Sequence, residues 1–142
     1  MDLKDIQYRL ANIEVVSKFM APAPGNSVGT EATLNIRLEI RVRPEDRMVM
    51  PFVTIEVKDE KGETELASYT AALLFEVINF TDAIKLNPQG LYHVPEALAA
   101  TLNAIGVSTV RGMLFTEFKG TYLQSILLPV VDIAALKREI SK

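Results

Sequence analysis

Residues 95–131 read PEALAATLNAIGVSTVRGMLFTEFKGTYLQSILLPVV, and this stretch decides the fold. Its first part carries large apolar residues every three or four positions, which places them along one face of a helix. These residues are Leu98, Leu102, Ile105, Val110, Leu114 and Phe118. Gly106 and Gly112 interrupt the pattern, and each costs about 1 kcal/mol of helix preference relative to alanine. We therefore expect a kink at these glycines, or a close contact with another backbone.

The second part of the stretch begins with a helix stop. Gly120 suits the position just after a helix, because glycine adopts positive φ without strain. The apolar run 121–129 that follows is predicted to be extended until Pro129 ends it. Asp132 can then cap a short last helix over residues 133–140, which has basic residues near the end that favours cations.

Upstream of this stretch, apolar and polar residues alternate in four segments. The clearest is 32–43, where alternation with a period of two predicts a strand with one buried and one wet face. The other predicted strands cover 6–20, where a bulge is expected, 53–58 and 66–77. Strands followed by helices predict an α+β fold. We expect one domain over residues 1–142, a four-stranded antiparallel sheet with the long helix and the short C-terminal helix on one face.

Residues 78–94 connect the last strand to the long helix and show no clear period. The segment holds several large apolar residues, yet Asn87-Pro88-Gln89-Gly90 interrupts any regular element. Structureless loops of this length are uncommon in compact domains and are often functional. We therefore treat this loop as a candidate binding region.

Composition excludes several classes of protein. The chain has 142 residues, no cysteine and a formal net charge of −3, so disulfides, thiolate chemistry and electrostatic attraction to nucleic acid are not expected. No apolar run approaches the roughly 20 residues of a membrane span. Residues 1–5 lack the basic and apolar segments of a signal peptide, so we expect a cytoplasmic protein.

No catalytic or metal-binding set is evident in the sequence, and no cofactor is implied. The chain has a single histidine, His93, and no phosphate-binding glycine loop, nucleophile elbow or metal-spaced cluster. Glu76 stands beside Phe75 and Val77 near a strand end, where a solvated carboxylate is the simpler interpretation than an acid or base. We therefore predict that the protein is not an enzyme.

The order of residues in 110–130 resembles the SecB protein-export chaperone family. The resemblance lies in a helix bearing Val110-Arg111, a turn Gly120-Thr121-Tyr122, and the Leu-x-x-x-Leu-x-Pro-Val pattern ending at Val130. It implies the same α+β fold over about residues 8–140. It also implies a tetramer built as a dimer of dimers, which holds unfolded preproteins in apolar grooves without ATP and passes them to the SecA motor through acidic residues.

Two departures weaken the implied link to SecA. Met20 and Ser68 stand where the resemblance would place acidic residues on the sheet, and the strand over 32–43 carries arginines on its wet face. A basic SecA tail would therefore meet too little negative charge. We expect SecA binding to be weak or absent.

A receptor for many unfolded sequences needs an exposed apolar surface that can repack. The candidate groove residues run from the last strand through the loop into the long helix. They are Leu73, Phe75, Val77, Ile78, Phe80, Leu86, Leu91, Tyr92 and Leu98. The alternative is that these residues form the ordinary core between sheet and helix.

The long helix also carries apolar residues outside its main stripe. Val107, Met113 and Phe115 do not fit the face that would pack on the sheet, and an extra apolar face needs a partner. We expect these three residues at the interface of a homo-oligomer, most simply a tetramer.

Three functions remain open from the sequence. The first is a SecB-like holdase for unfolded polypeptides or preproteins. The second is a dedicated SecB-like chaperone for one client, such as an antitoxin, which needs no acidic surface for SecA. The third is a ligand-binding or scaffold protein on the same fold.

Overall fold

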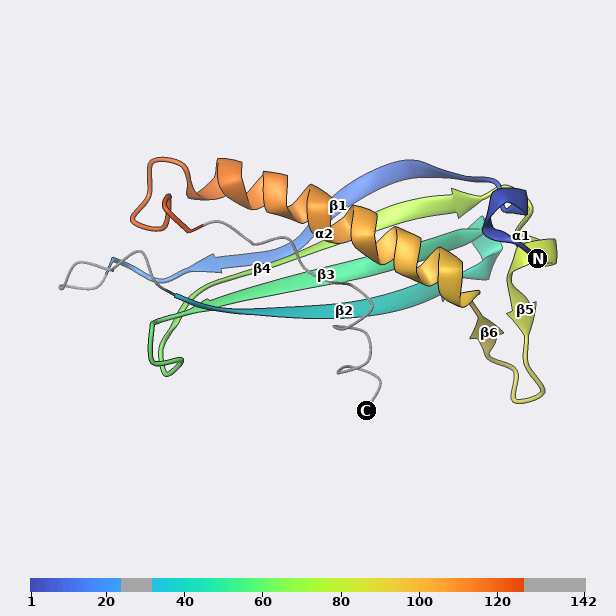
Figure 1. The fold of residues 1–142 in the computed structure, drawn as a ribbon, viewed down its shortest axis with the longest axis horizontal. Coiled ribbons are helices and arrows are strands. Elements are labelled where there is room, and N and C mark those ends of the chain that lie inside the picture. Colours follow the sequence, from blue (N-terminus) through green and yellow to red (C-terminus); the bar gives the residue numbers. More distant parts are fainter. Residues whose placement is uncertain (24–31, 127–142) are drawn as a thin grey trace.

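A computed structural model describes residues 1–23 and 32–126 of the protein. Its centre is a four-stranded antiparallel sheet with the order β1-β4-β3-β2, and one long helix lies across one face (Figure 1). The elements are β1 (Tyr8–Met20), β2 (Thr33–Arg43), β3 (Met48–Lys58), β4 (Glu65–Val77) and α2 (Glu96–Phe118). The predicted α+β fold is confirmed. The short helix predicted over 133–140 lies outside the described residues.

The connections follow the local chemistry of the chain. A short 3-10 helix (Pro44–Asp46) joins β2 to β3. Between β3 and β4, the Asp59 carboxylate accepts hydrogen bonds from the backbone N–H groups of Glu63 (2.8 Å) and Thr64 (3.3 Å). The bulge expected in the first strand is present, because the pairing of β1 with β4 shifts register after Leu10 and again after Val15.

Helix α2 packs chiefly on β3, and Gly106 marks the closest approach. A Cβ atom at this position would lie 3.0 Å from Cγ2 of Val53, so only glycine fits without a shift. The close contact at Gly106 is therefore with side chains of β3, not with another backbone as the sequence analysis expected. Gly112 has no close contact of either kind, since nothing lies within 4 Å of such an atom.

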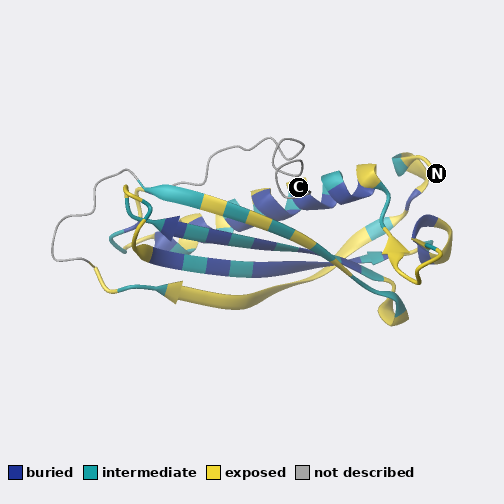
Figure 2. Ribbon diagram, turned by 90° about the horizontal axis from the view of Figure 1, so that it is seen from below, coloured by how far each residue is buried: buried dark blue, intermediate teal, exposed yellow. Residues whose placement is uncertain are grey.

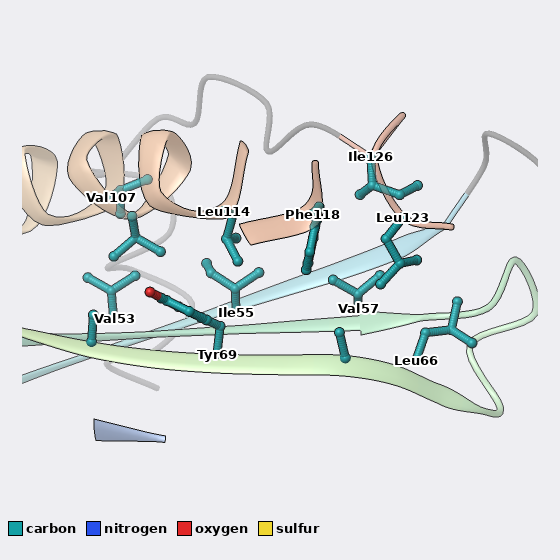
Figure 3. Close-up of a cluster of buried hydrophobic side chains, with 13 residues drawn as sticks. Val53, Ile55, Val57, Leu66, Tyr69, Val107, Leu114, Phe118, Leu123 and Ile126 are labelled. Carbon is teal, nitrogen blue, oxygen red and sulfur yellow. The ribbon is translucent and has the colours of Figure 1, made fainter. Parts of the chain in front are cut away.

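The core forms two clusters under α2. The larger one joins the inner side chains of β3 and β4 to the second half of the helix, with Ile55, Tyr69 and Phe118 among its members (Figure 3). The smaller one lies at the other end and contains Val49, Leu73, Phe75, Leu98 and Leu102. Ile6 joins this second cluster from the segment after the N-terminal 3-10 helix (Leu3–Asp5).

The residues after α2 do not form the extended segment that the sequence predicted. Gly120 has φ +81° and ends the helix as expected. The chain then turns through 121–126, with hydrogen bonds from Gln124 N to Thr121 O (3.2 Å) and from Ile126 N to Leu123 O (2.9 Å). The turn buries Leu123 in the larger cluster. The apolar character of Leu123 therefore follows from its burial in the core and does not require a strand. Residues 127–129 lie outside the described part.

The predicted loop 78–94 contains short regular elements. These are the four-residue helix α1 (Phe80–Ala83) and a small hairpin of β5 (Lys85–Leu86) and β6 (Tyr92–His93). Figure 1 shows them at one end of the sheet, near the N-terminus. Sequence periodicity missed these elements because two or four residues are too few to show a period.

Helix α2 has the bounds that the sequence predicted to within two residues, but it is more apolar than the sequence analysis allowed for. Its length and composition alone would permit a membrane span, a test that the core helix of a soluble protein also passes. In the structure one side of α2 is buried against the sheet.

Candidate functional site

The structure divides the nine candidate groove residues into a buried and an exposed group. The buried group belongs to the smaller core cluster and comprises Leu73, Phe75, Val77, Phe80 and Leu98. Side chains in this position stabilise the chain itself, so they are not accessible to a client in this conformation. For these five residues, the structure agrees with the alternative interpretation, in which they form the core between sheet and helix.

The exposed group gathers around the hairpin. Ile78, Leu86, Leu91 and Tyr92 form what we call the hairpin surface, and each exposes more than a third of its area. Leu91 and Leu86 are the most open, at 65% and 58%. Isolated exposed leucines are common on proteins, but four large apolar residues within one fifteen-residue segment form a candidate contact surface.

Two features hold the hairpin in place. At its turn, the Asn87 side-chain oxygen accepts hydrogen bonds from the backbone N–H groups of Gln89 (3.0 Å) and Leu91 (2.9 Å), and Gly90 takes φ +80°. At its base, the Tyr92 ring packs on the buried Phe80 ring with a centroid separation of 5.8 Å. The tip is therefore fixed in shape, while its leucines point outside the core.

The start of the hairpin region is joined to the start of β1. Ile78 N donates to Gln7 O at 2.7 Å, and Gln7 N donates to the Asn79 side-chain oxygen at 2.9 Å. The Asn79 amide in turn donates to Asp5 O at 2.8 Å. The hairpin surface thus begins directly beside the first edge strand of the sheet.

Strand β1 carries a second apolar surface, which the sequence analysis did not identify as a site. Leu10, Ile13, Val15, Val16 and Phe19 are all exposed, and we call them the β1 surface. Figure 2 shows β1 as the strand that is exposed along nearly its whole length. The adjacent pair Val15-Val16 was the available signal, because neighbouring strand residues point to opposite faces and both are apolar here.

The three predicted interface residues of α2 separate in the structure. Val107 lies in the larger core cluster and is only 3% exposed, so the argument that it falls outside the packing stripe was wrong. Residues spaced by four drift around a helix that has 3.6 residues per turn. The face packed on the sheet therefore also takes in residues outside the predicted stripe, and Val107 is one of them. Met113 is half-buried against the same cluster, and Phe115 is exposed.

Near the start of β1, one carboxylate lies between two arginines. Glu76, on β4, accepts a hydrogen bond from Arg9 Nε (2.8 Å) and another from Arg47 (2.9 Å). The Arg9 hydrogen bond, and then the charges of both arginines, hold the pKa of Glu76 below its ordinary value. His93 lies exposed on β6, and among residues 1–23 and 32–126 no three acidic or histidine side chains gather as a metal site.

Comparisons with known proteins bear on the fold. No family model matches the chain, and no curated protein matches it in sequence. In structure it resembles the SecB-like chaperone Rv1957 of Mycobacterium tuberculosis, solved in complex with a ChAD peptide from the HigA1 antitoxin Rv1956. The TM-score is 0.60 at 14% identity, covering 88% of this chain and 90% of that one. The fold is therefore SecB-like.

Proposed function

We propose that this protein is a molecular chaperone that binds unfolded polypeptides on an apolar surface without using a nucleotide. The observation that carries the proposal is the hairpin surface: four exposed apolar side chains, three on the hairpin and one, Ile78, just before α1. The shared fold with a SecB-like chaperone supports it. A cytoplasmic location and the lack of a chemical reaction belong to the same proposal.

The hairpin surface suits recognition of many sequences for a physical reason. Apolar contacts are not directional, so they accept varied side chains, whereas a fixed polar pattern would select one sequence. Each leucine fully covered by a client contributes about 1.5–3 kcal/mol, and several such contacts are needed to offset the cost of association. We expect the buried group, Phe80 in particular, to support the hairpin from below rather than to contact the client.

An aggregation assay tests this assignment. A variant with Leu86→Ser and Leu91→Ser should suppress the light scattering of a slowly refolding client much less than the unchanged protein does. Both side chains are exposed, so the variant should fold. The matched control is Lys85→Ser with Gln89→Ser, two exposed polar positions of the same hairpin, which should retain full suppression. Equal suppression by both variants would remove the hairpin surface from the proposed binding site.

A dedicated chaperone for one client is the second candidate. The related structure holds a peptide from an antitoxin, which favours this narrower role. The two candidates differ in range: a general holdase should protect several unrelated clients, whereas a dedicated chaperone should protect one. Comparing suppression across unrelated clients at equal molar excess distinguishes them.

Self-association is a further part of the proposal. The β1 surface and Phe115 are exposed apolar groups that a second copy of the chain would cover, and an uncapped edge strand can pair with another strand. We expect a homo-oligomer, and the resemblance to SecB favours a dimer of dimers.

A further inference from the structure

The short helix α1 and the residue after it cover one end of the smaller core cluster (Figure 1). In residues 80–84 the side chains of Phe80, Ala83 and Ile84 are buried in that cluster, while Thr81 and Asp82 are exposed. The residues beneath them come from β3, β4 and α2, and we call them the floor. They are Val49, Leu73, Phe75, Val77, Leu98 and Leu102.

Residues 80–93, which we call the lid, are tied to one another by several contacts. Lys85 Nζ donates to Thr81 O at 3.2 Å, the Tyr92 ring packs on the Phe80 ring, and β5 pairs with β6. The two hairpin strands contact mainly each other, and not the sheet or α2. The lid is therefore attached to the floor chiefly through the buried side chains of α1 and Ile84.

One side chain, Asn79, joins the start of the lid to the N-terminal segment. Its Oδ1 accepts a hydrogen bond from Gln7 N at 2.9 Å, and its Nδ2 donates to Asp5 O at 2.8 Å. Neither bond caps α1, although Asn79 stands at the N-cap position of that helix. Both bonds are exposed to water, so each contributes only modestly to holding the lid closed. We call this pair of bonds the clasp.

We propose that the lid is an internal pseudo-client, an autoinhibitory contact that fills a further polypeptide-binding site until a client segment displaces it. The floor already accepts one segment of its own chain, and that segment defines the ligand. It is an aromatic residue followed four positions later by a branched aliphatic one, as Phe80 and Ile84 are. A client segment of this pattern buries similar apolar area and so offsets the lost contacts of the lid.

This inference rests on the proposed function, because it gives client binding a closed and an open state. In the closed state the buried group supports the hairpin, and the hairpin surface alone is accessible. In the open state the floor is accessible as well. The clasp sets the balance between the two states, since it joins the lid to the N-terminal segment only while the lid is closed.

The clasp should therefore control affinity at the floor. The lid competes at the high effective concentration of a segment in the same chain. A free peptide binds only the fraction of molecules whose lid is open, and its apparent affinity is reduced by that fraction. Weakening the clasp should tighten peptide binding, whereas a purely structural role for Asn79 predicts no gain in affinity.

Fluorescence anisotropy with a labelled peptide of residues 79–85 tests this competition. Asn79→Ala should bind the peptide about tenfold more tightly than the unchanged protein, the change expected for losing two exposed hydrogen bonds. Asn79→Asp keeps an acceptor for Gln7 N but loses the donor to Asp5 O, so it should also bind more tightly. The matched control is Asp59→Ala, which removes two hydrogen bonds at the turn between β3 and β4, at the far end of the sheet (Figure 1). It should bind as the unchanged protein does.

Hydrogen exchange without peptide measures lid opening directly. A four-residue helix is too short to persist once it leaves the floor, so in Asn79→Ala the amides of Ala83 and Ile84 should exchange faster. Their exchange should rise by about the same factor as the affinity, while that of β3 should not change. This readout needs no client. The aggregation assay with Leu86→Ser, Leu91→Ser tests the proposed function by itself, so the two can fail separately.

Three results would overturn the proposal. They are equal binding of a peptide that carries Phe80→Ser and Ile84→Ser, no gain in affinity for Asn79→Ala over Asp59→Ala, and exchange in β3 that rises as much as exchange in the lid. If Asn79→Ala does not fold, Asn79→Asp decides by the same measurements. Tighter binding with faster exchange confined to the lid then supports the proposal, and any other result overturns it.

Discussion

Strands β1 and β2 are the two edges of one sheet, yet their apolar side chains are covered to different extents. The inner side chains of β2, from Leu34 to Val42, pack against the two core clusters, and its outer side chains form ion pairs. None of the exposed large apolar residues lies on β2 among the described residues. Strand β1 carries five of them and is exposed on both faces.

The difference follows from where α2 lies. The helix contacts chiefly β3, with a smaller contact to β4, so β1 extends beyond the area that the helix covers. Figure 2 shows the same contrast between the buried central strands and exposed β1. An edge strand with uncovered apolar residues on both faces is the kind that a second chain covers, while β2 is protected by charge. The following predictions test this contrast.

The largest effect should come from isoleucine-to-alanine changes on different strands. Ile55 on β3 is fully buried, so Ile55→Ala should lower the free energy of unfolding by about 2–5 kcal/mol. Ile36→Ala, on partly buried β2, should cost less, and Ile13→Ala on β1 should cost least. Urea denaturation at a protein concentration low enough to dissociate any oligomer measures all three. If Ile13→Ala cost as much as Ile55→Ala under these conditions, Ile13 would be buried within the single chain and the contrast would fail.

The next effect concerns self-association through β1. Two lysines placed at Ile13 and Val15 should weaken association at least about thirtyfold, because burying unpaired charge at an interface costs a few kcal/mol. Sedimentation velocity over a concentration series measures the change. The matched control places lysines at Thr33 and Asn35 on β2, which should leave association unchanged. Unaltered association in the β1 variant would assign the contact to another surface, with Phe115 the first candidate.

The smallest effect should be the pH dependence contributed by Glu76, which joins β4 to edge strand β1 through Arg9. Because the folded pKa is lowered, the stabilisation is present above the ordinary glutamate pKa of about 4.3 and is lost as the pH falls through the lower folded value. Glu76→Gln should therefore lose stability at neutral pH and flatten the acid side of the profile. Thermal unfolding across a pH series measures this.

A partner substitution completes that experiment. Arg9→Gln removes the hydrogen bond that lowers the pKa of Glu76 most, so it should flatten the profile in the same direction but less, since Arg47 remains. Acid profiles of both variants that coincide with that of the unchanged protein would show that this ion pair does not hold β1 to the sheet.

The sequence by itself determined the long elements and the class of fold. Alternation located the four strands, the three-to-four spacing located α2, and Gly120 marked its end, because these patterns depend on local backbone geometry. Local patterns also described the candidate site in part: Ile78, Leu86, Leu91 and Tyr92 were selected for their apolar character in an irregular segment, and they are exposed.

Only the tertiary structure decided which apolar faces are covered. Periodicity states which side chains share a face, but it does not state what lies against that face. Leu73 and Ile13 are paired across β4 and β1 and read alike in sequence, yet Leu73 is fully buried and Ile13 is exposed. The cause is the path of α2, which Gly106 allows to approach β3 closely and which leaves β1 uncovered.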